Sequence, residues 1–210
     1  MDNIIEALNW RYATKQFDSS KKLSAEQFET LLETARLSPS SYGLPTWKVI
    51  NVESKEIRQK LREAGYNQAQ FTDASHVLVF ASVMKIDDEL VHAFIENLAK
   101  ERGMEVKALE QYSNTIKGVT GMMTQDQKRS WAEKQAYIGM GMILLVAAEN
   151  RIDACPIEGF DKAKFDEILG LSEEGLTSAA VIALGFRDEK DAFAVMKKVR
   201  PKPEEFIIKK

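Results

Sequence analysis

The sequence predicts an α+β or α/β sandwich in which a small central sheet is wrapped by helices. Two observations favour this fold class: segments with helical spacing of apolar residues outnumber the strand-like segments, and helices separate the strand-like segments from one another. The 210 residues are 44% apolar and 29% charged, an ordinary globular composition that can bury a substantial core. We see no internal repeat, and we expect one domain over residues 1–210.

The expected helices are identified by apolar residues at helical spacing and by their end signals, and the one over residues 54–65 is polar. They cover residues 3–13, 23–38, 54–65, 87–103, 124–150 and 160–170. In the second of these, Ser24 and Gln27 form a capping-box pattern, and Pro39 stops the helix. The third ends at Gly65, because glycine readily adopts the conformation that terminates a helix.

Strands are expected where apolar residues alternate with polar ones, or where apolar and β-branched residues form a continuous run. Residues 74–83 and 176–186 are nearly continuous apolar runs, which are typical of strands buried on both faces. Residues 47–53 alternate in polarity, and residues 151–157 form a short strand. Serine, glycine and proline in residues 38–47 indicate a loop.

The long helix over residues 124–150 begins polar and becomes apolar all round, so its second half should be buried on every side. Such a helix is hard to bury within one chain of this size, and Gly139 and Gly141 permit another helix to approach closely. We therefore expect it to pack in a homodimer interface. A central helix of a monomer is the alternative.

Composition argues against several classes of partner. The formal net charge is −3, whereas general nucleic-acid binding needs an extended basic surface. The most apolar stretch, residues 138–149, is shorter than the roughly 20 residues that span a bilayer, so no membrane partner is expected. No signal peptide is evident, and the one cysteine, Cys155, reads as a buried thiol, which favours a cytoplasmic location.

No side chain is equipped for demanding chemistry by itself. Residues 139–142 contain G-x-G within a helical apolar run, without the third glycine of a dinucleotide fingerprint. His76, at a strand edge, and His92, on a helix, lack metal-ligand spacing, so we expect His76 to be structural and His92 to be exposed. We expect no catalytic side chain and no metal. If the protein is an enzyme, a cofactor supplies the reactivity.

Two cationic clusters lie at opposite ends of this acidic chain, and with two further segments they form a recognisable set. The four segments read RYATKQFD at 11–18, SPSSYGLPTWKV at 38–49, ACPIEGFD at 154–161 and KKVRP at 197–201. In this order and spacing they resemble the FMN-dependent nitroreductase family, in the branch of oxygen-insensitive NAD(P)H nitroreductases and dihydropteridine reductases. The resemblance covers essentially the whole chain. It implies a homodimeric α+β sandwich with FMN bound at the dimer interface.

The resemblance implies which residues bind the FMN phosphate and the reactive ring. Phosphate contacts are implied for Arg11, Lys198 and Arg200, with Ala13 where the family often has serine and Tyr12 contributing its main chain. Lys15 is implied near flavin N1 and O2, where a fixed cation stabilises the reduced anion. Pro156 and Ile157 offer an apolar wall, and the backbone N–H of Glu158 or Gly159 points at N5.

Other positions also match the family pattern, although some residues differ from those the family usually has. Asn67 matches an asparagine at the pyrimidine edge of the flavin, and Ser40 and Ser41 match serines presented by the partner subunit. Pro45, Thr46 and Trp47 stand where the family usually reads Q-P-W, so the shape of this loop is left open. Gln70 replaces a lysine associated with NAD(P)H binding, which leaves NADH or NADPH open. Residues 100–123 are a variable excursion over the substrate side, with no substrate residue assigned.

The implied function is that of an FMN-dependent NAD(P)H oxidoreductase. It would reduce nitroaromatics, quinones or similar flat acceptors by ping-pong hydride transfer through flavin N5. Two alternatives stay open: a flavoenzyme of this fold with another reaction, such as enone reduction or dehalogenation, and a non-catalytic FMN-binding protein. Lys15 at the flavin edge argues against a mere carrier.

Overall fold

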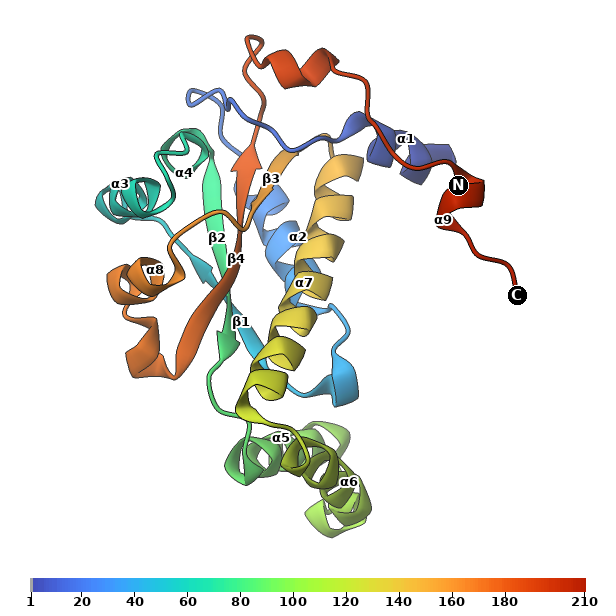
Figure 1. Cartoon of the computed structure of the whole chain (residues 1–210). Helices are drawn as coiled ribbons and strands as arrows, with labels where there is room; N and C mark the ends of the chain where they lie inside the picture. Colours follow the sequence, from blue (N-terminus) through green and yellow to red (C-terminus); the bar gives the residue numbers. More distant parts are fainter. Residues whose placement is uncertain (1) are drawn as a thin grey trace.

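A four-stranded antiparallel sheet forms the centre of the molecule. The structure is a computed structural model and describes residues 2–210. The strands are β1 (Trp47–Asn51), β2 (His76–Val83), β3 (Asp153–Ile157) and β4 (Leu176–Gly185), in the order β1-β2-β4-β3. Every neighbouring pair is antiparallel. The predicted small central sheet is confirmed, and the antiparallel pairing makes the fold α+β (Figure 1).

Helices cover both faces of this sheet. Their bounds are α1 (Asp2–Trp10), α2 (Ala25–Arg36), α3 (Lys55–Ala64), α4 (Gln70–Asp73), α5 (Asp88–Arg102), α6 (Glu110–Gly121), α7 (Gln125–Glu149), α8 (Lys162–Leu169) and α9 (Pro203–Phe206). Helices α2 and α7 lie on one face, while α3, α4 and α8 lie on the other (Figure 1). Helices α5 and α6 lie beyond one end of the sheet.

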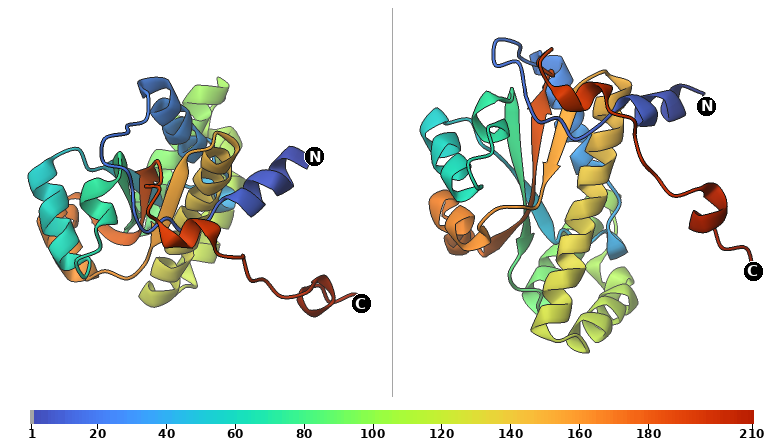
Figure 2. Two further views of the ribbon diagram at one scale, coloured as in Figure 1. Left: turned by 90° about the horizontal axis from the view of Figure 1, so that it is seen from above. Right: turned by 45° about the horizontal axis from the view of Figure 1, so that its top comes forward.

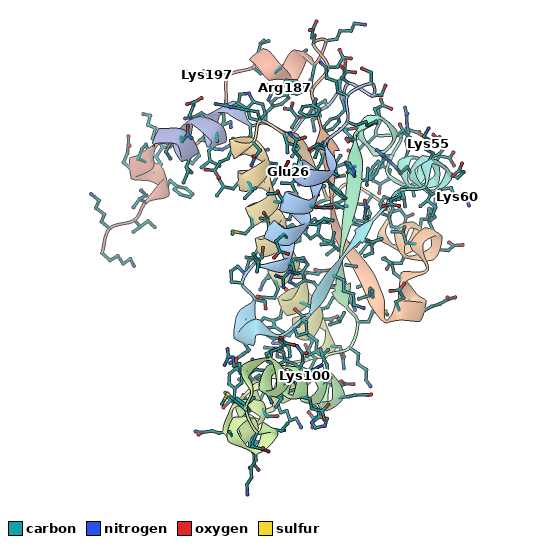
Figure 3. The ribbon with its side chains drawn as sticks, turned by 180° about the vertical axis from the view of Figure 1, so that it is seen from behind. Glu26, Lys55, Lys60, Lys100, Arg187 and Lys197 are labelled. Atoms are coloured by element: carbon teal, nitrogen blue, oxygen red, sulfur yellow. The ribbon has the colours of Figure 1, made fainter. Side chains whose placement is uncertain are left out.

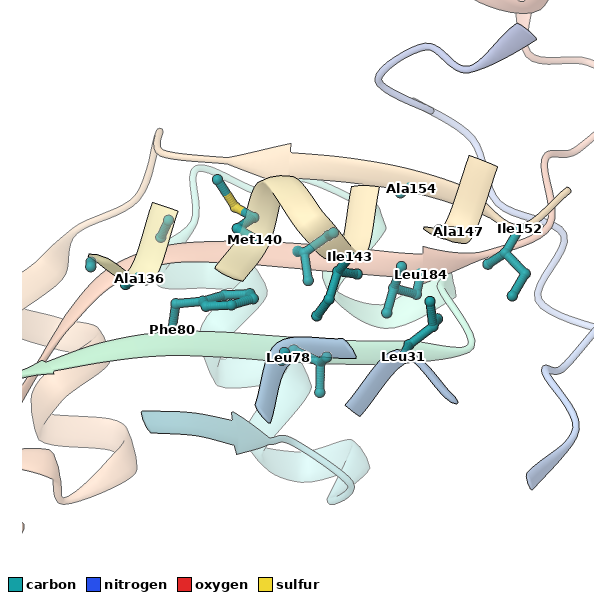
Figure 4. Close-up of a cluster of buried hydrophobic side chains, with 14 of the residues drawn as sticks. Leu31, Leu78, Phe80, Ala136, Met140, Ile143, Ala147, Ile152, Ala154 and Leu184 are labelled. Atoms are coloured by element: carbon teal, nitrogen blue, oxygen red, sulfur yellow. The ribbon is translucent and has the colours of Figure 1, made fainter. Parts of the chain in front are cut away.

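The alternation of side chains along the strands builds a separate core on each face. In β2, Leu78 and Phe80 pack toward α2 and α7 (Figure 4), whereas Val77 and Val79 pack toward α3 and α8. All four are fully buried, and burial of a side chain of this size contributes roughly 1.5–3 kcal/mol. The continuous apolar run is therefore explained by a strand that is covered on both faces.

The capping box predicted at the start of α2 and the glycine end predicted for α3 are confirmed. The Ser24 hydroxyl accepts a hydrogen bond from the Gln27 backbone N–H at 3.2 Å, and the Gln27 side chain accepts one from the Ser24 N–H at 2.9 Å. Gly65 caps the C-terminus of α3. His76 is half-buried and stacks on Phe28 with ring centroids 3.8 Å apart, as expected of a structural residue.

Helix α7 differs from its prediction, because its second half is not buried on every side within one chain. One side packs on the sheet, whereas Ile138 is 42% exposed and Met142 is 39% exposed on the other. Gly139 also does not provide the close contact with another helix that was predicted. A Cβ there would lie 2.3 Å from the Trp47 ring, so this glycine admits Trp47 of its own chain. Gly141 is exposed and has open space around it.

The C-terminal segment runs away from the body of the molecule. Both views in Figure 2 show it extending beyond the helices and the sheet after η4 (Ala192–Val195). Phe206, Ile207 and Ile208 are exposed along it. No helix within residues 2–210 combines the length and the apolar character needed to cross a membrane.

Candidate functional site

A cavity of about 560 Å³ lies where three distant segments of the chain meet. Its lining comes from residues 9–13 and Lys15 after α1, from Pro156 in β3 and from the C-terminal residues 193–200. Figure 3 shows Lys197 and Arg187 at one end of the molecule and Lys100 of α5 at the other. The site is therefore placed at the end of the sheet remote from α5 and α6.

Pairing with β3 and β4 explains why the segment after α1 lies at this end of the sheet. Ala13 forms a parallel bridge with Ala154, and Phe17 forms an antiparallel bridge with Arg187. The Arg187 guanidinium also lies over the rings of Trp10 and Tyr12, at 4.3 and 4.6 Å from their centroids. These contacts hold residues 10–17 against the sheet before any ligand binds.

Five Lys and Arg residues line this cavity, and three of them, Arg11, Lys198 and Arg200, affect one another's charge without a carboxylate ion-paired to them among the described residues. Burial lowers the pKa of Arg11, and the charge of Arg200 lowers it further. Burial also lowers the pKa of Lys198, with added effects of Arg11 and Arg200. No Asp or Glu within residues 2–210 is ion-paired with any of the three. The arrangement suits an anionic ligand.

The hydrogen bonds of these cations leave donors for such a ligand. The Lys198 ammonium donates to the carbonyl oxygens of Leu8 and Arg11, which fixes its position. Arg200 Nη1 donates to the neighbouring Val199 carbonyl at 2.6 Å, its one hydrogen bond to the part of the chain that the structure describes. Arg11 Nε is buried and has no hydrogen-bond partner within residues 2–210. A buried guanidinium N–H without an acceptor is costly, so an acceptor supplied by a ligand would stabilise it.

Seven of the predicted residues line this cavity: Arg11, Tyr12, Ala13, Lys15, Pro156, Lys198 and Arg200. The sequence interpretation of Ile157 needs correction at the side-chain level. Its side chain is 4% exposed and packs in the core on the α3 and α8 face of the sheet. Because neighbouring strand residues point to opposite faces, only Pro156 of these two residues presents its side chain to the cavity.

Glu158, Gly159 and Asn67 are outside the set of residues that line this cavity. Gln68 Nε2 donates to the Gly159 carbonyl at 2.7 Å and so ties the Asn67 turn to the segment after β3. The Tyr137 hydroxyl, from α7, donates to the Glu158 carboxylate. Burial and this hydrogen bond raise the pKa of Tyr137. The sequence did not single out Gln68 or Tyr137, which form these two hydrogen bonds.

The turn at Asn67 is held in an unfavourable backbone conformation. Tyr66 and Asn67 are consecutive non-glycine residues with φ of 57° and 58°. A left-handed conformation costs an L-residue roughly 1–2 kcal/mol, although asparagine tolerates it better than most. Both side chains are exposed. Strain of this kind is concentrated at ligand sites, which makes the turn a candidate contact region.

Ser40 and Ser41 do not reach the 560 Å³ cavity within one chain. Ser40 lines a separate cavity of about 660 Å³ between α2 and β1. The Ser41 backbone N–H donates to Gln135 Oε1 of α7 at 2.9 Å. Pro45 also lines this second cavity, and Trp47 stacks near Phe80 at 5.8 Å. Any contribution of the two serines to the first cavity therefore requires a second copy of the chain.

Comparison with known proteins identifies the family. The sequence profile of the Nitroreductase family matches residues 8–186. Two relatives carry the name "Putative NAD(P)H nitroreductase". The one from Bacillus subtilis, YfkO, is 39% identical over 202 residues, covering 88% of each chain. The one from Staphylococcus epidermidis is 37% identical over 217 residues, covering 97% of this chain and 95% of the relative. The chain belongs to the nitroreductase family.

Solved structures share the fold. The Bacillus subtilis protein ydfN superposes with a TM-score of 0.88 at 20% identity over 100% of both chains. A protein of Exiguobacterium sibiricum, solved in complex with FMN, has a TM-score of 0.83 at 23% identity and covers 99% of this chain and 97% of its own. CLA-ER, an enone reductase of gut-bacterial fatty acid saturation, has a TM-score of 0.81 at 21% identity, covering 99% of this chain and 98% of its own.

Proposed function

We propose that this protein is an FMN-dependent NAD(P)H oxidoreductase that reduces nitroaromatics, quinones or similar flat acceptors. The observation that carries the proposal is the convergence of Arg11, Lys198 and Arg200 on one cavity beside Pro156. Membership of the nitroreductase family supports it, as do the relatives named as NAD(P)H nitroreductases. We further propose that the chain acts as one FMN-binding domain.

The residues at the cavity fit FMN. The unpartnered Nε of Arg11 and the two other cations would bind the phosphate, since guanidinium and ammonium groups form their strongest hydrogen bonds with such oxygens. Pro156 would contact one ring face, and Asn67 the pyrimidine edge. Bound FMN would supply the two-electron chemistry, with hydride entering at N5 from NAD(P)H and leaving to the acceptor in a second half-reaction.

The protein's own groups would orient the ring and stabilise charge. The Lys15 side chain is exposed at the cavity while its backbone N–H is anchored at 2.8 Å to Asp191. A cation on an anchored backbone, near the edge of the ring that becomes negative, would stabilise the reduced state. The main chain at Glu158 and Gly159, restrained by Tyr137 and Gln68, would donate a hydrogen bond at N5.

The proposal is tested with purified protein. It should retain or bind FMN, show flavin absorbance in the visible, and lose this colour under anaerobic conditions when NADH or NADPH is added. Adding a nitroaromatic or a quinone should restore the colour. A protein that retains no FMN after unbound flavin is removed would exclude the function. A protein that binds FMN but whose flavin neither nucleotide reduces would be a non-catalytic FMN-binding protein.

We also propose that the active form is a homodimer. Exposed apolar residues on α7, namely Ile138 and Met142, form a stripe beside Gly141. The projecting C-terminal segment exposes Phe206, Ile207 and Ile208, while β1 is an edge strand beside the 660 Å³ cavity. A second copy would cover these surfaces and would bring its Ser40 and Ser41 toward the first cavity.

A second candidate function is reduction of an activated carbon–carbon double bond. The observation in its favour is that the enone reductase CLA-ER shares the fold over nearly the whole chain. The cavity residues would bind the same cofactor in both cases and do not select the acceptor. A panel of nitroaromatics, quinones and enones, assayed with one enzyme preparation and each nucleotide, distinguishes the two by their kcat/KM values.

A further inference from the structure

Asp191 lies next to the proposed phosphate site but does not line it. It is 3% exposed and lies directly before η4, in the segment that leads to Lys198 and Arg200. Its carboxylate accepts four hydrogen bonds. Oδ2 accepts from the Tyr12 hydroxyl at 2.9 Å and from the backbone N–H groups of Lys15 at 2.8 Å and Gln16 at 3.1 Å. Oδ1 accepts from the Phe193 N–H at 3.1 Å.

These bonds join two segments that are far apart in the sequence. Tyr12 and Asp191 are separated by 179 positions, and Lys15 and Asp191 by 176. The bond to Phe193 alone would make Asp191 an ordinary cap of η4. The three hydrogen bonds at Oδ2 do not cap η4, because all three donors belong to the segment that carries Arg11 and Lys15.

The carboxylate is charged and is balanced by dipoles of the main chain. Burial opposes ionisation, but the hydrogen bonds from Lys15, Gln16, Phe193 and Tyr12 together outweigh it and lower the pKa of Asp191. No Lys or Arg side chain within the described residues 2–210 forms an ion pair with it. Its charge is therefore used to bind the backbone of the N-terminal segment, not to neutralise the nearby cations.

We propose that Asp191 is a positioning residue that sets the relative placement of the two halves of the phosphate site. It holds Tyr12, Lys15 and Gln16 on one side and starts the turn toward Lys198 and Arg200 on the other. This inference rests on the proposed function, in which those cations bind the phosphate of FMN. It predicts that loss of the carboxylate weakens binding of the phosphorylated flavin more than binding of riboflavin.

The test compares Asp191→Asn with Asp188→Asn. Asparagine keeps the size but offers one carbonyl oxygen, so it cannot accept at both carboxylate positions and must lose one link. Asp188 is a matched control, because its side chain accepts from the Lys190 N–H at 2.8 Å within the same turn and its carboxylate has no hydrogen bond to residues 11–16. Affinities for FMN and for riboflavin are measured by fluorescence with the apoproteins.

For Asp191→Asn we expect the Kd for FMN to rise about tenfold or more, since the charge-assisted hydrogen bonds that hold the N-terminal segment at the phosphate site are weakened. The Kd for riboflavin should rise less than about threefold, and Asp188→Asn should leave both near the wild-type values. Unchanged FMN affinity, or equal losses for the two flavins, would overturn the positioning role. A wild-type protein that binds neither flavin would instead defeat the proposed function itself.

Tyr12→Phe provides a second variant if Asp191→Asn fails to fold. It keeps the aromatic ring against Arg187 and removes only the hydroxyl that donates to Asp191. We expect a smaller loss of FMN affinity, about two- to fivefold, with little effect on riboflavin. An equal effect on the two flavins, or none on either, would contradict the inference.

Discussion

Lys198 and Arg11 are separated by 187 positions in the sequence, yet the Lys198 ammonium donates to the Arg11 carbonyl. With Lys15, Lys197 and Arg200 they place five positive charges at one cavity in a protein whose formal net charge is −3. Repulsion among them opposes folding unless an anion is bound. At the scale of single residues, the function depends on whether that anion is the phosphate of FMN.

Arg200→Ala tests the phosphate contact directly. Removing this guanidinium should raise the Kd for FMN about 10- to 100-fold, because charge-assisted hydrogen bonds are the strong ones. Riboflavin has no phosphate, so its Kd should change less than about twofold. Lys202→Ala is the control, since Lys202 is exposed and does not line the cavity. Equal losses for FMN and riboflavin in Arg200→Ala would argue against a phosphate contact.

Lys15→Met tests the proposed cation at the flavin edge. Without the ammonium, the negative charge of the reduced flavin is less stabilised, so the two-electron potential of bound FMN should fall. We expect a shift of roughly 30–60 mV, which corresponds to about 1.4–2.8 kcal/mol. Lys15→Arg keeps the charge and should restore most of the shift. An unchanged potential in Lys15→Met would place this side chain away from the ring.

The individual residues differ in how far the sequence could predict them. The cluster Arg11, Lys15, Lys198 and Arg200 could be selected from basic segments that match a family pattern. Asp191 could not, since an aspartate before a short turn has no spacing that indicates a partner more than 170 positions away. Gln68 is a similar case, because its acceptor at Gly159 is defined only by the folded chain.

Among the elements, α7 shows how far an apolar sequence pattern predicts which sides of a helix are buried, and by what. Its all-round apolar composition predicted burial correctly for the sheet-facing side, where Ile143 and Ala147 are fully buried. The pattern could not say what covers Ile138 and Met142, because composition does not distinguish burial by the same chain from burial by another. It also could not assign Gly139 to Trp47, which comes from a different element.

Gly139→Ala should destabilise the protein. The new methyl group would overlap the Trp47 ring, and overpacking typically costs roughly 1–3 kcal/mol. This outweighs the gain of up to about 1 kcal/mol from replacing a helical glycine. Gly118→Ala is the matched control, because Gly118 of α6 has open space and should gain about 0.5–1 kcal/mol. The free energy of unfolding in urea checks both. A stabilised Gly139→Ala variant would contradict the packing described here.

The strands and the helix ends were the most predictable elements. The apolar runs of β2 and β4 follow from burial on both faces, and the capping box of α2 follows from two side chains three positions apart. The antiparallel pairing and the order β1-β2-β4-β3 could not be deduced, because both depend on how distant segments meet. The short α4 and α9 lack enough turns to show a period.

For the whole molecule, the exposed apolar surfaces predict a dimer in solution. Light scattering coupled to size-exclusion chromatography should give the mass of two chains at micromolar concentration. The double variant Ile138→Lys, Met142→Lys should shift this toward one chain, because it places charges on the exposed stripe of α7. Met84→Lys is the control, since Met84 is 54% exposed just after β2. A monomeric wild-type protein would exclude the proposed assembly.

The place where FMN binds decides the proposed function, and a crystal structure of the protein grown with FMN would reveal it. We expect the phosphate within hydrogen-bond distance of Arg11, Lys198 and Arg200, with the ring beside Pro156 and with Ser40 or Ser41 contributed by a second copy. A phosphate bound elsewhere, with those three cations facing solvent, would contradict it.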